Sequence, residues 1–161
     1  MTYSMSPLGG EAVERVEAQG FRLPEPMNAG DQPKLPEDLS DLDDEMLMNE
    51  YALFTAWADY ANAQVGLAII AEREAERHLE YLTGLFWSDQ PRTKPVTTIK
   101  AEAAQEPGIV DATEALDRAT AYRRVVSSLA AFYERDAAVL SRELSRRIQP
   151  DRMSKRERYT T

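Results

Sequence analysis

Two long stretches of the chain repeat apolar residues at the spacing of an amphipathic helix. The first runs from Leu47 to Phe86 and contains no proline. Its apolar or small residues return every seven positions, and a second row follows four residues later. The first row is Leu47, Phe54, Ala61, Ala68, Ala75 and Leu82, and the second is Tyr51, Ala58, Val65, Glu72, Leu79 and Phe86. This pattern predicts one helix of about forty residues, roughly 60 Å long, which needs partner helices to cover its stripe.

The second stretch runs from about Ile109 to Arg147 and shows the same seven-residue repeat. Its main row is Ala112, Ala119, Val126, Tyr133 and Leu140. Prolines at 91 and 95 mark residues 88–98 as a connector. We expect Thr98 to cap a short helix over residues 99–105, which Pro107-Gly108 then interrupts. Together these elements predict an all-α fold, an antiparallel hairpin of two long helices with a short helix in the connector.

The two ends of the chain lack this repeat. Glycine and proline punctuate residues 1–38, which predicts an extended, flexible, acidic arm with room for two helical turns over residues 11–18. Ser40 is the expected cap of the first long helix, so the hairpin domain spans residues 39–148. Residues 149–161 are charged and are expected to form a flexible tail. The length of the hairpin and its small residues predict a homo-oligomer. The contacts assigned to it are Leu47, Phe54, Trp57, Val65, Leu79 and Leu82.

Charge is distributed unevenly over the chain. The net charge is −9, and residues 1–50 hold twelve acidic and three basic side chains, whereas residues 141–161 hold three acidic and seven basic ones. The whole molecule therefore repels nucleic acid at long range, while its basic end can bind it locally. There is no cysteine, which excludes disulfides and thiol chemistry and fits a reducing cytoplasm. No segment has the length and apolarity of a membrane span or the pattern of a signal peptide, so we expect an intracellular, soluble protein.

No pattern of residues in the sequence indicates catalytic chemistry. His78 is the only histidine, and we expect it to be structural. Glu72, Glu76 and His78 lack the Glu-x-x-His spacing of di-iron bundles. Glu72 lies on the apolar stripe, where it would set the helix register or pair with an arginine of the second helix. The sequence therefore predicts a protein that is not an enzyme and holds no metal or cofactor.

Basic and aromatic residues are the better functional candidates. Arg142, Arg146 and Arg147 follow one another near the end of the second helix, where cations also suit the helix dipole. Three more cations lie in or beside the connector, and three aromatic residues precede it. The cations are Arg92, Lys94 and Lys100, and the aromatic residues are Tyr81, Phe86 and Trp87. Cations beside aromatic rings are typical of single-stranded nucleic-acid binding, although Phe86 and Trp87 also suit the closed end of a helical core.

Several of these positions resemble a known family. The runs Phe54-Thr55-Ala56-Trp57 and Tyr81-Leu82-Thr83-Gly84, with Glu72 between them, are similar to the first long helix of UvsY-type recombination mediators of tailed bacteriophages. In the second half Lys100, Leu116, Tyr122 and Val139-Leu140-Ser141-Arg142 are similar as well. The resemblance is one of spacing and architecture, and it covers residues 40–148.

The resemblance implies a ring-forming helical protein that binds single-stranded DNA. Such mediators help a RecA-like recombinase replace the single-strand-binding protein in the bacterial host cytoplasm. The positions that match the family's DNA-binding residues are Arg73, Arg77, Lys94 and Lys100. The alternative is a structural protein of the phage particle or its assembly, which would act through helical oligomerisation and would be found in the virion.

Overall fold

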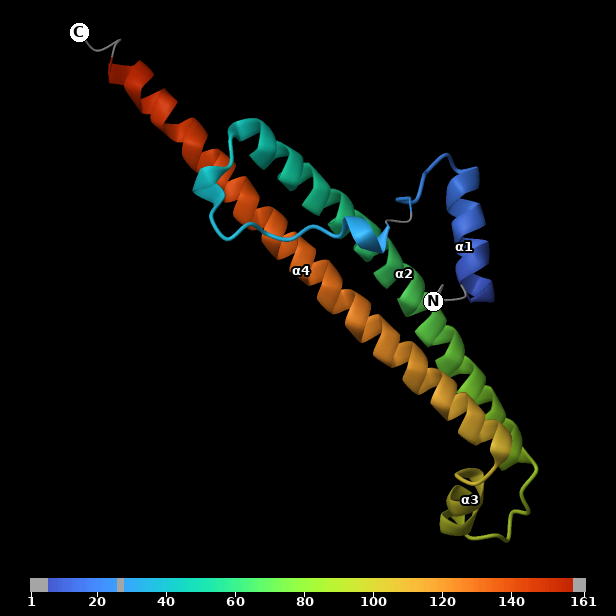
Figure 1. The fold of residues 1–161 in the computed structure, drawn as a ribbon. Coiled ribbons are helices and arrows are strands. Elements are labelled where there is room, and N and C mark those ends of the chain that lie inside the picture. Colours follow the sequence, from blue (N-terminus) through green and yellow to red (C-terminus); the bar gives the residue numbers. More distant parts are fainter. Residues whose placement is uncertain (1–5, 26–27, 158–161) are drawn as a thin grey trace. The chain divides into compact units, whose positions relative to one another are not determined.

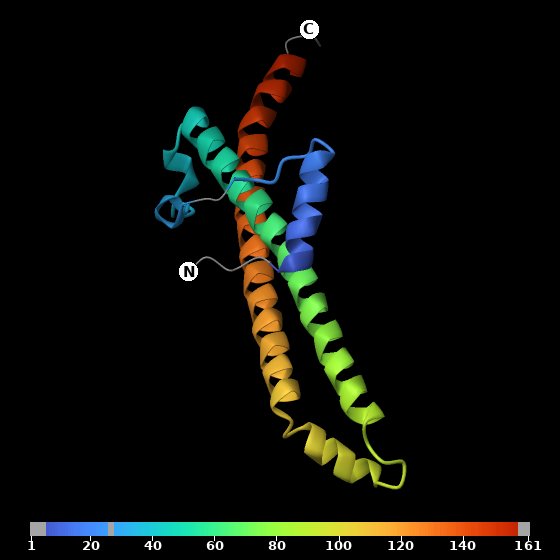
Figure 2. The same ribbon diagram turned by 90° about the vertical axis from the view of Figure 1, so that its right-hand side faces the viewer.

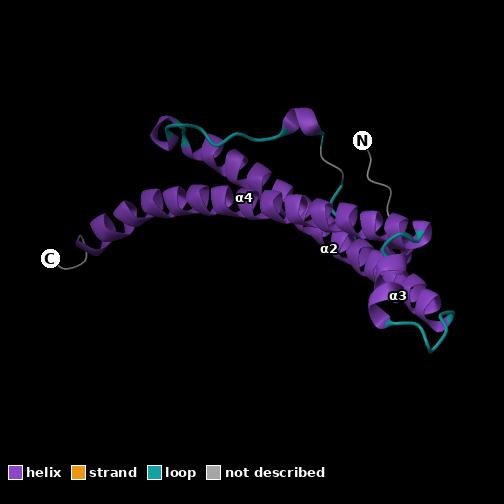
Figure 3. Cartoon of the chain, turned by 90° about the horizontal axis from the view of Figure 1, so that it is seen from below, coloured by secondary structure: helices purple, strands orange, loops and turns teal. Residues whose placement is uncertain are grey.

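The computed structural model describes residues 6–25 and 28–157, and every regular element in them is helical. The α-helices are α1 (Pro7–Ala18), α2 (Asp44–Ser88), α3 (Val96–Ala103) and α4 (Pro107–Glu157). Single 3-10 turns lie at Ala29–Asp31 and Leu39–Asp41. No strand occurs among the described residues (Figure 3). The predicted all-α class, the two long helices and the short helix between them are confirmed.

The chain divides into two compact units. Unit 1 comprises Met1–Leu23 and Gln64–Val126, and unit 2 comprises Pro24–Ala63 and Ser127–Thr161. Both long helices continue from one unit into the other. Within each unit the α2 and α4 segments run side by side in opposite directions (Figures 1 and 2). The hairpin is therefore built from two local helix pairs, each with its own core.

Large side chains fill the core of unit 2. Phe54, Leu47 and Leu140 are fully buried. The ring of Tyr133 from α4 lies 5.4 Å from the Trp57 ring and 6.4 Å from the Phe54 ring, between centroids. The seven-residue repeat brings these residues to one face of each helix, so burying them drives the helices together.

A segment before α2 covers part of this unit, and we call residues 28–43 the strap. Pro33 is buried, and the Gln32 side-chain amide donates a hydrogen bond of 2.5 Å to the Tyr133 hydroxyl. Arg147 of α4 donates to the carbonyls of Leu39 and Leu42 at 2.7 and 2.8 Å. Of the predicted flexible arm over residues 1–38, Gln32 contacts α4 through its hydrogen bond to Tyr133. The flexibility of the arm stays a prediction.

Small residues form the core of unit 1. Besides Ile109, the buried positions on the paired helices are Ala68, Ala71, Ala112, Ala119 and Val126. Helix α3 lies at the end of the pair (Figure 2). It adds the buried side chains of Ile99 and Ala103. Alanine and valine in these rows allow the two backbones to approach closely, and α3 closes the open end.

One polar bridge crosses the helix pair of unit 1. Glu72 accepts hydrogen bonds from the Arg123 guanidinium and, at 2.9 Å, from the Thr120 hydroxyl. The Arg123 hydrogen bond lowers the pKa of Glu72, although burial partly opposes it. The prediction that Glu72 pairs with an arginine of the second helix is confirmed.

Several predicted helix ends are wrong by a few residues. Asp43, not Ser40, caps α2, because its carboxylate accepts from the Met46 amide at 2.7 Å. Pro95, not Thr98, precedes the first residue of α3, and α3 ends at Ala103. Pro107 begins α4 rather than interrupting the chain, since proline needs no amide partner in the first turn of a helix.

The chain ends also contain more helix than expected. Helix α1 includes Gly9 and Gly10 and is capped by Ser6, whose hydroxyl accepts from the Gly9 amide at 3.2 Å. The chain then turns at Gly20, where φ is +87° and glycine is favoured. Helix α4 continues to Glu157, past its predicted end at Arg147. Residues 158–161 of the predicted tail and 1–5 of the predicted arm lie outside the described residues.

Replacing Leu47 by alanine should test the core of unit 2. Its side chain is fully buried, so we expect the free energy of unfolding to fall by about 2–5 kcal/mol. The neighbouring Met48 is 52% exposed, and Met48→Ala should change stability by less than about 0.5 kcal/mol. Urea unfolding of both variants measures the difference. Equal losses would show that this face of α2 is not the buried one.

Candidate nucleic-acid interface

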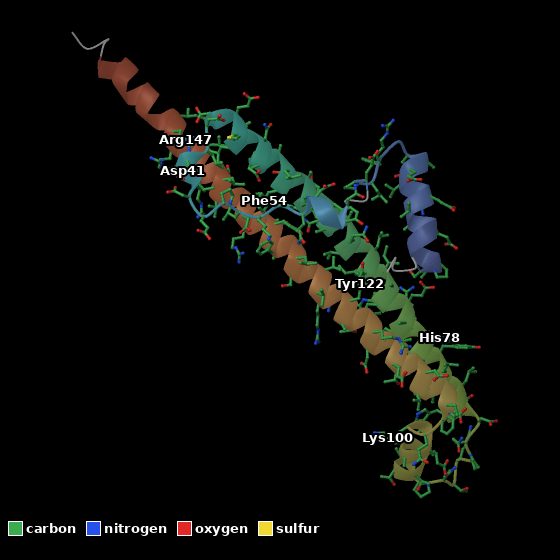
Figure 4. All side chains as sticks on the ribbon, in the orientation of Figure 1. Asp41, Phe54, His78, Lys100, Tyr122 and Arg147 are labelled. Atoms are coloured by element: carbon green, nitrogen blue, oxygen red, sulfur yellow. The ribbon has the colours of Figure 1, made fainter. Side chains whose placement is uncertain are left out.

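The candidate surface in unit 1 comprises the last turns of α2, the connector 89–95 and α3. The connector turns back through a hydrogen bond of 3.0 Å from the Lys94 amide to the Pro91 carbonyl. Pro95 then accepts from the amides of Thr98 and Ile99, both at 3.1 Å, which starts α3. These turns leave Arg92 exposed in the connector. Lys100 is exposed on α3 (Figure 4).

The three cations of this region differ in their partners. Lys94 forms an ion pair with Glu102 of α3 and donates a hydrogen bond of 3.0 Å to the Gln90 side chain. Arg92 and Lys100 form no ion pair with any residue that the structure describes. Lys94 therefore holds the connector against α3, while Arg92 and Lys100 are available to an anionic ligand.

The aromatic residues before the connector also differ. Tyr81 is 62% exposed, whereas Phe86 and Trp87 are each half-buried. Phe86 lines an open hollow of about 440 Å³ together with Leu82, Leu85 and Ile109. Phe86 therefore belongs partly to the closed end of the helix pair. This agrees with the expectation that it suits the end of a helical core. Tyr81 offers the most accessible ring for stacking.

Two arginines of α2 precede these aromatic residues. Arg73 pairs with Glu76 at 2.6 Å, and Arg77 forms no ion pair with a described residue. Arg77 and Tyr81 are four residues apart, so they occupy one face of the helix. His78 is exposed on α2 (Figure 4). An accessible cation and an accessible ring thus lie on one face of α2 just before the connector.

The basic cluster near the end of α4 belongs to unit 2 and is used differently. Arg146 forms two hydrogen bonds with Glu143, at 2.6 and 2.8 Å. Arg147 binds both Glu143 and Asp44 at 2.9 Å, in addition to the strap carbonyls. These arginines, first Arg146 and then Arg147, lower the pKa of Glu143 to about 2. Only Arg142 of the three is exposed without an ion pair among the described residues.

The structure places the predicted oligomer contacts at two levels of burial. Leu47, Phe54 and Trp57 are buried in the core of unit 2. They contact the chain's own helices, so a surface between chains must use other residues of this unit. Val65, Leu79 and Leu82 in unit 1 are half-buried. A role for them between chains stays a prediction.

Sequence reasoning missed the structural role of Arg147. Part of the signal was visible, because Glu143 precedes Arg146 by three residues and Arg147 by four, the spacing of helical ion pairs. The strap carbonyls that bind Arg147 could not be found this way, since they lie 105 and 108 residues away along the chain.

Two features are absent from the described residues. No group of three or more histidine, cysteine or acidic side chains in them is arranged to hold a metal ion. None of their helices combines the length and apolarity needed to cross a membrane.

Comparison of the chain with protein-family models, with curated proteins and with solved structures gave no match.

The lowered pKa of Glu143 predicts how acid affects stability. A carboxylate with a lowered pKa stabilises the fold above its unfolded value, near 4.5, and loses that contribution as the pH falls toward about 2. Between pH 4.5 and 2 the urea midpoint should therefore fall more steeply for the natural chain than for Glu143→Gln. Parallel curves for the two proteins would show that the arginine pairs of Glu143 do not persist in solution.

Proposed function

We propose that this protein is a non-catalytic binder of single-stranded DNA and that its DNA surface is the connector end of unit 1. One observation supports this most directly. Arg92 and Lys100 are exposed and unpaired among the described residues, close in sequence to the exposed ring of Tyr81 and the half-buried ring of Trp87.

Each residue type has a distinct part in such binding. Arg92 and Lys100 would contact phosphates, which supply affinity without reading sequence. Tyr81 and Trp87 would stack on unpaired bases, which are accessible only in a single strand. Arg77 lies one turn before Tyr81 and would extend the contact along α2.

The local charge limits the strength of this interaction. Residues 89–106 contain three basic and three acidic side chains, so the connector region has no net charge. Lys94 is already neutralised by Glu102. Arg92 and Lys100 remain in this region, and Arg77 of α2 brings the number of cations at this surface without a described ion pair to three. Three cations predict a modest affinity with a shallow dependence on salt.

The biological role that we propose is that of a recombination mediator. The resemblance of residues 40–148 to UvsY-type mediators supports it. In this role a homo-oligomer in the host cytoplasm holds single-stranded DNA while a RecA-like recombinase displaces the single-strand-binding protein. The family also supplies the expectation of a ring.

A second candidate is a structural protein of the virion or its assembly. It is favoured by unit 2, where Arg146 and Arg147 are neutralised within the chain and several large apolar side chains are exposed. Such a protein would assemble without DNA affinity and would be retained in purified particles.

Removing the two free connector cations should test the DNA surface. For three phosphate contacts we expect the logarithm of the binding constant to fall with the logarithm of salt with a slope of about −2. Arg92→Ala/Lys100→Ala should reduce that slope by about 1.4 and weaken binding at low salt at least about tenfold. Fluorescence anisotropy of a labelled oligonucleotide measures both quantities.

The matched control is Arg118→Ala/Arg124→Ala, which removes two exposed cations from α4 of the same unit. It should leave the slope and the affinity nearly unchanged. If both double variants lose affinity equally, binding reflects overall charge and the connector is not the site. Negligible affinity of the natural chain at low salt would favour the assembly protein.

A further inference from the structure

The connector of unit 1 is closed by a chain of polar side-chain contacts. The Gln90 side chain donates a hydrogen bond of 3.3 Å to the Phe86 carbonyl and accepts one of 3.0 Å from the Lys94 ammonium. The Lys94 ammonium also forms the ion pair with Glu102 of α3. We call Gln90, Lys94 and Glu102 the connector clamp. It links the last turns of α2 to α3 across the connector.

The contact at Phe86 has a physical reason in the end of the helix. Because α2 ends at Ser88, the Phe86 carbonyl is one of the last four of the helix, which lack an amide partner within it. The Gln90 side chain supplies that partner. Gln90 and Lys94 are both half-buried, so water screens their contacts less than those of a fully exposed pair.

The hydrogen bond between Gln90 and Lys94 spans the turn that carries Arg92. The Lys94 amide donates to the Pro91 carbonyl at 3.0 Å, so residues 91–94 form a turn with Arg92 at its second position. The side chains on the two sides of this turn are then joined to each other. The backbone of Arg92 is therefore held in one conformation before any ligand binds.

The ion pair with Glu102 fixes α3 in relation to that turn. Helix α3 is also anchored by the burial of Ile99 and Ala103. Lys100 lies two residues before Glu102 and is exposed (Figure 4). Arg92 and Lys100, the free cations of the proposed DNA surface, thus come from separate segments, and the connector clamp joins those segments.

We propose that Gln90 and Lys94 are positioning residues of the DNA surface, which hold Arg92 and Lys100 in place before DNA arrives. The inference rests on the proposed function and deepens it, because it assigns a role to residues that contact no phosphate. Groups that are already ordered lose less conformational freedom on binding, which raises affinity without adding a contact. Lys94 then has a different role from the direct DNA contact that the resemblance implies for it.

The salt dependence of binding separates positioning from phosphate contact. Losing one phosphate contact reduces the salt slope by about 0.7, whereas losing preorganisation weakens binding and leaves the slope unchanged. Gln90→Ala removes no charge and should weaken binding about threefold to tenfold at constant slope. Lys94→Met should do the same, because the cation that it removes is already neutralised by Glu102. Fluorescence anisotropy of a labelled single-stranded oligonucleotide measures both quantities.

Lys100→Met and Gln105→Ala are the matched controls. Lys100→Met removes a free cation and should reduce the slope by about 0.7. Gln105→Ala removes an exposed, uncharged side chain just after α3 and should change neither the slope nor the affinity. Circular dichroism should show that all four variants keep the helical content of the natural chain.

The positioning role and the DNA surface can fail separately in this experiment. Unchanged affinity of Gln90→Ala, or a slope for Lys94→Met that falls as far as that for Lys100→Met, would overturn the positioning role and leave the DNA surface in place. A natural chain without affinity for the oligonucleotide would overturn the DNA surface and the positioning role with it.

Discussion

The packing of α2 against α4 is the constraint on which the remaining structure depends. Neither helix can bury its apolar stripe alone, so each must cover the other. In unit 2 this is achieved by large side chains such as Phe54 and Leu140, and in unit 1 by alanines such as Ala68 and Ala119. The same arrangement leaves the connector and the exposed side of α3 free for other contacts.

Helix pairing also determines which charges remain available. Glu72 binds Arg123 across the pair of unit 1, and Glu143 binds Arg146 and Arg147 in unit 2. These arginines stabilise the fold and are poor candidates for a ligand, because binding one would break an internal ion pair. The count of basic residues therefore overstates the DNA-binding capacity of the chain. The cations that no described carboxylate neutralises carry the functional argument.

The sequence predicts what depends on local periodicity. Spacing along the chain predicts the two long helices and the connector helix. It also predicts that Glu72 pairs with an arginine of the second helix. The helix caps were harder to assign, because Ser40 and Asp43 are both good caps and only the geometry of the preceding turn selects Asp43. The strap was not predicted, since Gln32 meets Tyr133 across 101 residues and no local pattern encodes that contact. For the candidate surface, spacing identified the cations but could not show which of them are already paired.

The two tryptophans of the chain offer a direct test of where DNA binds. Trp57 is buried in unit 2, and Trp87 lies at the end of α2 in unit 1. In Trp57→Phe, whose only tryptophan is Trp87, single-stranded DNA should quench the emission because bases stack on or beside that ring. In Trp87→Phe, whose only tryptophan is Trp57, the same titration should leave the emission nearly unchanged. A DNA surface at the connector would be contradicted if DNA quenched Trp57 but not Trp87, or if it quenched neither tryptophan.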